Sequence, residues 1–444
     1  MRGFRSLIVL VLVAIPIGWL TWRESKRTDT DDAPKKETVF TVESDKIEEI
    51  TVKAESGERT VLQKSPDKGW QIVAPTTGAP DPAEVSGLTS NLSSLEIQRV
   101  VDENPPELKE YGLSQPRIEV SFKSGGQQHT LLLGQKTPPG TDVYAKRSSD
   151  QKVFLIGAHL ESTFNKGTFD LRDKSVLKVD RDKLDAVEIT TADRTMRFVK
   201  PSGEWQLAAP VQGRADYSAI ESLVSRLTGL QMKSVAEGVD EKKTGLDKPV
   251  ATVRMGTGSS QATLAIGAPA GEGAVYARDL SRPVVFTIES SALDDLKKDP
   301  SDYRQKDLFD ARSFNATRLE IVRAGQTHAF EKTKSKNKEG QDEEKWRQLS
   351  PQARELDQAS FDALMSAVTG LRATGFVDAA TAAKALATPE LTVTIKFDEG
   401  KKEEKVSFTK SGSDVLAARA GEAGAAKLEA TALDGVTKAL QELK

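Results

Sequence analysis

The chain has 444 residues, which is too long for one ordinary hydrophobic core, and we expect two to four domains. Charged residues make up 29% of it, yet the net charge is only −3, a balance that argues against nucleic acid as a partner. Cysteine is absent, which excludes disulfides, thiolate metal sites and cysteine nucleophiles.

An apolar run near the N-terminus, residues 7–22, is flanked by basic residues on both sides. At about 1.5 Å per residue it makes about 24 Å of helix, and Trp19 and Trp22 can extend it at the interface of a hydrocarbon core of ~30 Å. No site suited to signal-peptide cleavage follows the run. We therefore predict an uncleaved membrane anchor over residues 1–22. A cleaved signal peptide and a buried soluble helix are the alternatives.

Residues 23–38 are polar and lack hydrophobic periodicity, which is typical of a flexible tether. A large body after one N-terminal anchor favours a cytoplasmic N-terminus. We expect a single-pass protein of the inner membrane, anchored through residues 7–22, with its bulk in the periplasm.

One hexapeptide frame occurs three times in the chain. It begins at a tryptophan and ends at a proline, over residues 70–75, 205–210 and 346–351, and its tryptophans are 135 and 141 residues apart. The chain has only five tryptophans, so three in one frame indicate an internal repeat.

A helix is predicted after each copy of this frame. An aspartate eleven residues after the tryptophan is placed to cap the helix through its carboxylate. Four apolar residues then follow at helical spacing on one face. In the first copy, Pro82 takes the first helical position and Glu84 suits a capping box. The three sets are Asp81 with Val85, Leu88, Leu92 and Leu95; Asp216 with Ile220, Leu223, Leu227 and Leu230; and Asp357 with Phe361, Leu364, Val368 and Leu371.

Alternating apolar and polar residues predict strands on both sides of this helix. The upstream strands form a hairpin whose last strand carries the tryptophan. A Gly-Leu-x-x-Pro turn at Gly112 and Gly245 introduces the downstream strands, whereas the third copy keeps only Leu386 and Pro389. A short helix closes each copy, around residues 160–164, 293–296 and 433–440.

These patterns predict an α+β fold: three tandem repeats of a mostly antiparallel sheet with packed helices, after one N-terminal transmembrane helix. The predicted domains are residues 39–175, 176–308 and 309–444. A unit of this length carries its own core, so we expect tandem domains and not the short units of a solenoid.

No pattern in the sequence assigns a catalytic, cofactor-binding or metal-binding residue. His129, His159 and His328 fall on three segments without ligand spacing, and there is no phosphate-loop or nucleophile-elbow motif. We expect a non-enzymatic protein without a cofactor.

Three recurring positions are candidates for binding, and each has a structural alternative. A repeated acid suits a binding groove or a turn. A repeated tyrosine, lost in the third copy, suits ligand contact or packing. The tryptophan suits stacking on a ligand, although its alternation with apolar partners favours a core position. These residues are Asp102, Glu237 and Asp378; Tyr144 and Tyr276; and Trp70, Trp205 and Trp346.

The motifs together resemble one bacterial family. They are the anchor, the Trp-to-Pro strand, the capped helix, the Gly-Leu turn, the Leu-Gly strand at Gly134, the Val-Tyr-Ala strand at Tyr144 and the Arg-x-Lys joint at Arg172. They resemble the domain of unknown function 4340 family over about residues 40–440. The resemblance implies a membrane-anchored, extracytoplasmic protein, often encoded near gliding-motility-type ABC transporter components, with no catalytic residues to assign.

These observations leave three hypotheses for the function, each of a different class. The first is a non-enzymatic scaffold or auxiliary of an envelope complex, with an ABC transporter component as its membrane-protein partner. The second is a module that binds an envelope polymer or peptide through sheet edges or grooves between domains. An unrecognised hydrolase is a third.

Overall fold

The computed structural model describes residues 37–258, 260–336 and 342–443. The predicted anchor, residues 1–22, and nearly all of the predicted tether lie outside these ranges. Within them, no helix has the length and apolar character needed to cross a membrane. The chain divides between Lys174 and Ser175 into two compact units, the first with one sheet and the second with two.

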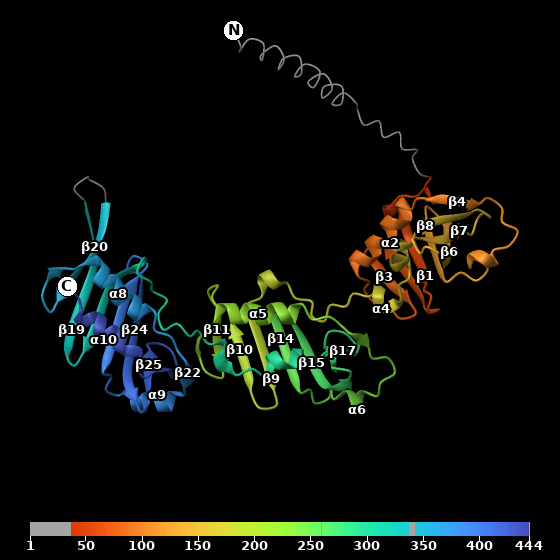
Figure 1. Cartoon of the computed structure of the whole chain (residues 1–444). Helices are drawn as coiled ribbons and strands as arrows, with labels where there is room; N and C mark the ends of the chain where they lie inside the picture. The colour runs from red at the N-terminus through yellow and green to blue at the C-terminus, as the bar shows by residue number, and fades with distance from the viewer. Residues whose placement is uncertain (1–36, 259, 337–341, 444) are drawn as a thin grey trace, which may run out of the picture. The chain divides into compact units, whose positions relative to one another are not determined.

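The first unit is an eight-stranded sheet with helices against one face (Figure 1). Its strand order is β3-β2-β1-β5-β6-β7-β8-β4, and all neighbouring strands are antiparallel. The strands are β1 Ile47–Lys53, β2 Arg59–Ser65, β3 Gly69–Ala74, β4 Arg99–Asp102, β5 Ile118–Ser124, β6 Gln127–Lys136, β7 Asp142–Arg147 and β8 Val153–Gly157. The helices are α2 Pro82–Ser94, α3 Glu161–Phe164 and α4 Thr168–Leu171, with 3-10 turns η1 Ser44–Lys46, η2 Lys109–Tyr111 and η3 Ala158–Leu160.

The second unit holds two nine-stranded sheets with the same order plus one short edge strand each, β12 and β21. The first of them has β9 Ala186–Thr191, β10 Thr195–Val199, β11 Gln206–Ala209, β12 Gly213–Arg214, β13 Ser234–Val235, β14 Ala251–Thr257, β15 Ser260–Gly271, β16 Ala274–Asp279 and β17 Phe286–Glu289. Its helices are α5 Tyr217–Thr228, α6 Glu241–Thr244 and α7 Ala292–Leu296, with 3-10 turns η4 Arg181–Lys183 and η5 Pro300–Tyr303.

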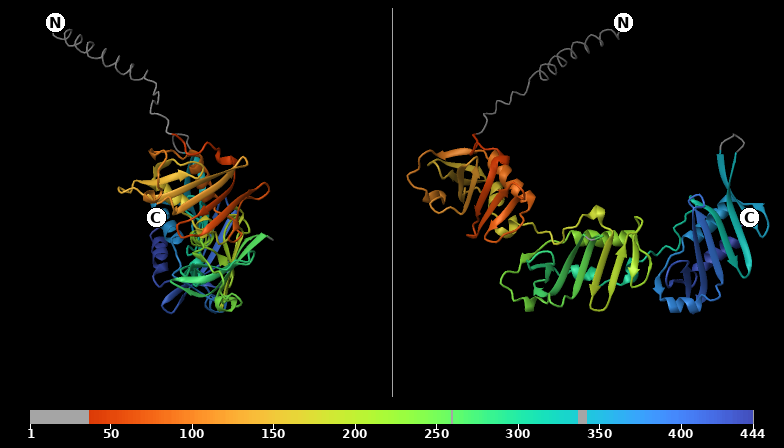
Figure 2. Two further views of the ribbon diagram at one scale, coloured as in Figure 1. Left: turned by 90° about the vertical axis from the view of Figure 1, so that its right-hand side faces the viewer. Right: turned by 180° about the vertical axis from the view of Figure 1, so that it is seen from behind.

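The last sheet repeats this plan. Its strands are β18 Ala316–Arg323, β19 Gln326–Lys336, β20 Asp342–Ser350, β21 Arg354–Glu355, β22 Gly375–Val377, β23 Leu391–Phe397, β24 Lys402–Ser411, β25 Asp414–Arg419 and β26 Ala425–Glu429. Its helices are α8 Gln358–Thr369, α9 Ala379–Ala385 and α10 Ala432–Gln441. Figure 2 shows the long helix of each repeat lying against its sheet. The α+β prediction and the tandem repeat are confirmed.

The helix that follows each tryptophan is built as its sequence pattern predicts. In α2, the Asp81 carboxylate accepts hydrogen bonds from the backbone N–H groups of Ala83 and Glu84. Its apolar face is buried in the core formed with the sheet. The predicted capping box is wrong in one detail. The Glu84 carboxylate does not accept from the backbone of the capping residue; it pairs with the Lys166 ammonium, 3.1 Å away.

The proline of each hexapeptide frame follows a cis peptide bond, at Ala74-Pro75, Ala209-Pro210 and Ser350-Pro351. The chain thus turns in the same way after all three tryptophan strands. In each repeat the capping aspartate follows this proline by six residues and begins the long helix.

The third repeat departs from the other two at one close backbone contact. In the first repeat, Gly112 has a left-handed φ of 67°, and a Cβ on Gly134 would lie 2.0 Å from the carbonyl oxygen of Tyr111. The third repeat has Thr409 where the register places Gly134. Ala385 at the end of α9 stands where the first repeat has Gly112, so the third repeat has neither glycine.

Candidate functional site

The three histidines lie on separate elements, as the sequence predicts. His129 on β6 packs against the rings of Phe40 and Phe122, and His159 lies in η3. His328 lies on β19, where burial lowers its pKa. Within residues 37–258, 260–336 and 342–443, no three His, Asp or Glu side chains are grouped to hold a metal ion.

The repeated acid has local structural roles in two of its three copies. Asp102 ends β4 and accepts a hydrogen bond from the Asn104 backbone N–H at 2.9 Å. Asp378 caps α9 by accepting from the Thr381 N–H at 2.9 Å. Glu237 is exposed. The repeated tyrosine also packs: the Tyr144 ring lies 5.2 Å from that of Tyr111.

The three repeated tryptophans differ in exposure. Trp205 and Trp346 are each only 4% exposed, so the predicted core position holds for both. Trp70 is partly buried and borders a cavity of about 460 Å³ between β3 and α2. Equivalent positions in one fold therefore give two closed sites and one open site.

Charged side chains close the site around Trp205. Its indole Nε1 donates a hydrogen bond to Glu221 on α5, at 2.8 Å, and this bond lowers the pKa of Glu221. Arg181, the first residue of η4, donates to the other carboxylate oxygen at 3.2 Å. The Lys200 ammonium lies over the indole, 5.3 Å from its centroid.

An aromatic side chain closes the site around Trp346. The Phe361 ring on α8 stacks on the indole, with 4.4 Å between centroids and 27° between planes. Lys332, which faces Trp346 across the β19–β20 pair, lies over the ring at 5.5 Å. Trp205 and Trp346 also border surface cavities, but little of either indole reaches them.

Each of these closing groups is missing or turned away around Trp70. Lys64 faces Trp70 across the β2–β3 pair, yet its ammonium donates to the Asp45 carbonyl oxygen at 3.0 Å. Ser44 begins η1 where Arg181 begins η4, and Ser86 takes the place of Glu221 on the helix.

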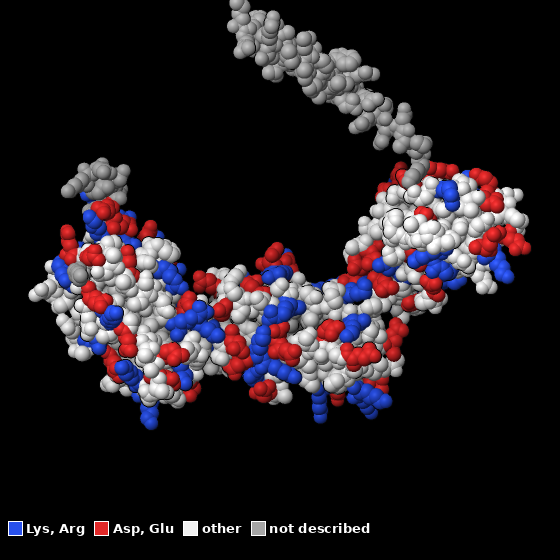
Figure 3. Space-filling view, in the orientation of Figure 1, with Lys and Arg blue, Asp and Glu red and all other residues white. Residues whose placement is uncertain are grey.

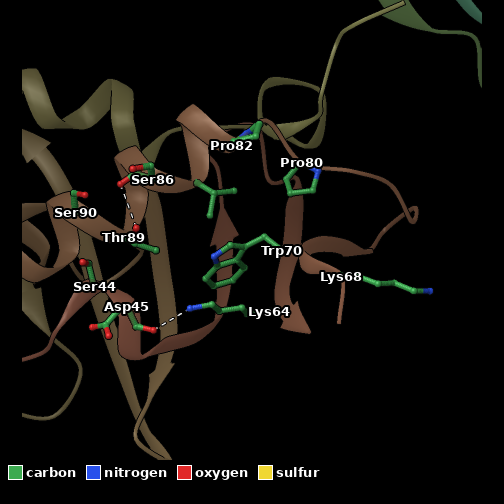
Figure 4. A pocket seen from close by; sticks show the side chains of 11 residues that line it. Ser44, Asp45, Lys64, Lys68, Trp70, Pro80, Pro82, Ser86, Thr89 and Ser90 are labelled. Atoms are coloured by element: carbon green, nitrogen blue, oxygen red, sulfur yellow. Dashed lines mark hydrogen bonds between the residues drawn. The ribbon is translucent and has the colours of Figure 1, made fainter. Parts of the chain in front are cut away.

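The result is an open cavity beside the indole (Figure 4). Small polar side chains from α2 and η1 lie on one side of the ring, and Lys68 points away from it. Within the described part of the chain, the indole N–H of Trp70 and the hydroxyls of Ser44, Ser86 and Ser90 make no hydrogen bonds to the protein.

A second cavity of about 520 Å³ shares Asp45 and Lys64 with the first. Its other walls include Glu49, Gln63 and Lys123 from the first sheet. These side chains alternate with the core-facing Ile50, Leu62 and Phe122, so most of the second cavity lies on the sheet face opposite the indole.

A network of ion pairs joins the second and third repeats inside the second unit. Arg214, on β12, contacts Glu422 at 2.7 Å and Asp310 at 2.6 Å. Its Nη2 also donates to the carbonyl oxygens of Asp307 and Leu308, at 2.9 and 3.2 Å. One arginine of the second repeat therefore holds the segment that enters the third.

Glu404 is the most buried acid of this network, at 3% exposure. It accepts hydrogen bonds from the backbone N–H groups of Asp310 and Ala311, and Arg419 pairs with it at 2.7 Å. Burial raises the pKa of Glu404 even beside this arginine. Nearby, the Arg304 guanidinium lies over the Phe376 ring at 3.9 Å.

The other two entering segments are held within their own repeats. Arg147 donates to the Val39 carbonyl oxygen at 2.9 Å, and Arg282 donates to the Val176 carbonyl oxygen at 2.5 Å. In the third repeat, Arg214 of the preceding repeat makes the equivalent contact. The joint between the second and third repeats is thus built from both of them.

Sequence reasoning missed the residues that make these two sites. Ser44, Lys64 and Ser86 appear in the sequence as ordinary polar residues, and so do Arg214 and Glu404. Comparison of the copies at fixed distance from the tryptophan would have singled out Ser86, because the second copy has glutamate there.

The surface charge is mixed, as the net charge suggests. Figure 3 shows basic and acidic side chains interspersed over the visible face, without a large area of one sign. Such a surface lacks the basic stripe that is typical of nucleic-acid-binding proteins.

Comparison with known proteins found one family. The model described as "Domain of unknown function (DUF4340)" matches residues 70–204 and 205–390. Each match begins at a repeated tryptophan, Trp70 within β3 and Trp205 directly before β11, so the matched unit starts at the third strand of the shared order. No curated protein and no solved structure is significantly similar to the chain.

Proposed function

This chain belongs to the DUF4340 family, and from that premise we propose that it is a non-enzymatic, membrane-anchored extracytoplasmic scaffold or auxiliary of an envelope complex. In this proposal, residues 7–22 hold the protein at the inner membrane. An ABC transporter component is the partner class that the family resemblance implies.

The observation that carries the proposal is the charged joint between the second and third repeats. Buried ion pairs are weak evidence for stability, but they specify one geometry among alternatives. Here Arg214, Asp310 and Glu422 come from three segments and hold two sheets in one arrangement. A fixed arrangement of tandem domains suits a protein that positions partners.

The face of the first sheet opposite its long helix supports the same scaffold function, because its polar side chains pair with one another. On the first sheet, Lys53 pairs with Glu119 at 2.7 Å, and Ser121 bonds Thr130 at 2.9 Å. Paired polar side chains of this kind make a regular surface with few apolar residues. Such a surface fits the polar, reversible contacts of an auxiliary subunit better than an obligate interface.

The test is fractionation and crosslinking of the full chain in intact cells. We expect the protein in the membrane fraction after an alkaline wash, and crosslinks from Lys53 and Lys123 on the open sheet face to a membrane protein identified by mass spectrometry. A chain that lacks residues 1–36 is the control, and it should leave the membrane fraction.

Two outcomes would overturn the proposal. One is recovery of the full chain in the cytosol. The other is that no membrane protein is crosslinked or co-purified from cells in which the full chain is stably produced.

A further inference from the structure

We propose that the cavity beside Trp70 is a binding site for sugar rings of a polysaccharide. This inference concerns the first repeat alone and is independent of the scaffold function. A scaffold without a glycan ligand would crosslink to a membrane protein but bind no sugar. A glycan-binding protein without a membrane partner would bind sugar but give no such crosslink.

The first argument is the free indole face. Lysine and helix side chains cover Trp205 and Trp346, whereas Lys64 donates to the Asp45 carbonyl oxygen and Trp70 stays partly exposed. An indole face carries partial negative charge, so it attracts the weakly positive C–H groups on the flat side of a pyranose ring. Tryptophan also provides a large, rigid contact area at little cost in conformational entropy.

The second argument is the rim of the cavity. The hydroxyls of Ser44, Ser86 and Ser90 have no partner within the described residues, and each can both donate and accept a hydrogen bond. Sugar hydroxyls have the same double capacity. A hydrocarbon ligand would leave these groups unpaired, and a cationic ligand would meet Lys64.

The third argument is the size of the cavity. A cavity of about 460 Å³ lies in the range of roughly 300–1,000 Å³ usual for ligand pockets. A volume of this size accommodates sugar rings of an oligosaccharide beside the indole.

An extended peptide fits this site less well. Peptides that add to a sheet need free backbone groups along an edge strand. On β3, the backbone N–H and C=O of Ile72 are both bonded to Gly78, at 2.9 and 3.0 Å. The Trp70 side of the edge strand is therefore partly covered by its own chain.

The test transplants the closed site of the second repeat into the first. In Ser44→Arg/Ser86→Glu, the new pair takes the positions of Arg181 and Glu221, which cover Trp205. The matched control is Ala83→Glu, which adds charge to an exposed position on the same helix, outside the cavity lining. Circular dichroism and thermal unfolding show whether each variant folds as the natural chain does.

The probes are cellotetraose, maltotetraose and chitotetraose, with tetra-alanine as the peptide arm. Binding to the full chain is measured by saturation-transfer difference NMR and by titration calorimetry. We expect at least one tetrasaccharide to bind, with saturation strongest at ring C–H protons. The closing variant should lose affinity by at least about tenfold, and Ala83→Glu should bind as the natural chain does.

Trp70→Ala is a second variant that does not depend on the transplanted pair, and it should also abolish binding. The proposal is overturned if no tetrasaccharide binds at concentrations up to about 10 mM. It is also overturned if binding survives in folded Ser44→Arg/Ser86→Glu and Trp70→Ala, or if tetra-alanine binds at this site in place of the sugars.

Discussion

Trp70 and Trp205 occupy the same place in two copies of one fold. Trp70 lies on β3 and Trp205 directly precedes β11. Each lies near a lysine, Lys64 or Lys200, and its repeat has a long helix capped by an aspartate. The Trp205 indole is closed in by an arginine, a glutamate and the lysine and is only 4% exposed, whereas the Trp70 indole is partly exposed to the cavity beside it. The fold therefore sets where the indole lies, and a few polar positions around it set whether a ligand can reach it.

The largest difference we predict between the two tryptophans is their effect on stability. Trp205→Ala removes a buried indole and leaves Glu221 without its hydrogen bond, so it should cost about 3–5 kcal/mol. Trp70→Ala removes a partly exposed indole and should cost roughly 1–2 kcal/mol. Hydrogen exchange resolved by peptide measures each repeat separately, because a chain of several domains has no single unfolding free energy.

Equal losses in the two repeats would contradict this comparison. The core assignment of Trp205 itself would be wrong if Trp205→Ala left exchange and melting unchanged while abolishing binding to a partner.

The joint inside the second unit allows the next prediction. Arg214→Ala leaves Glu422 and Asp310 without their closest cation and frees two backbone carbonyls, so it should weaken the joint by about 3 kcal/mol. We expect the second and third repeats to melt at separate temperatures in calorimetry. Arg254→Ala is the control, because its half-exposed ion pair with Glu188 is worth less than about 1 kcal/mol. Unchanged melting of Arg214→Ala would show that the network does not couple the repeats.

A smaller loss of stability is expected at the close contact between Gly134 and the Tyr111 carbonyl oxygen, which the third repeat lacks. A Cβ on Gly134 would lie 2.0 Å from the Tyr111 carbonyl oxygen, so Gly134→Ala forces the backbone apart and should cost about 2 kcal/mol. Thr409→Ala, at the equivalent position of the third repeat, is the control and should cost less. The measurement is exchange of the β5–β6 amides, and normal protection in Gly134→Ala would contradict the prediction.

The parts of the fold that the sequence predicts are those set by local patterns. The cap at Asp81, the buried helix face and the alternating strands each depend on residues within one turn or one strand. Because these patterns recur at fixed distances from the tryptophan, they also predict the repeat.

The two sites could not be predicted in this way, because each depends on residues from distant segments. Whether Trp70 is open depends on Ser44, Lys64 and Ser86, which lie on a turn, a strand and a helix. Glu404 lies in a run of charged residues on β24 that predicts exposure, yet it is buried by contacts with Arg419 and the backbone at Asp310. Only the packed sheets bring such groups together.

The smallest predicted effect is a pH dependence that only the closed site should have. The hydrogen bond from Trp205, with Arg181 and Lys200 nearby, lowers the pKa of Glu221 below its ordinary value of 4.5. Stability from a group whose pKa is lowered by folding is present above the ordinary value and is lost as the pH falls through the lowered value. Acid should therefore open the site around Trp205 and leave Trp70 as accessible as it is at neutral pH.

Acrylamide quenching measures this opening in variants that keep only one of the five tryptophans, with the others changed to Phe. Quenching of Trp205 should rise as the pH falls below 4.5, and Glu221→Gln should remove the pH dependence because the amide does not titrate. If Glu221→Gln kept the same pH profile, another group would control access to Trp205. The comparison with Trp70 would then depend on steric closure by Arg181 and Lys200 and not on the charge of Glu221.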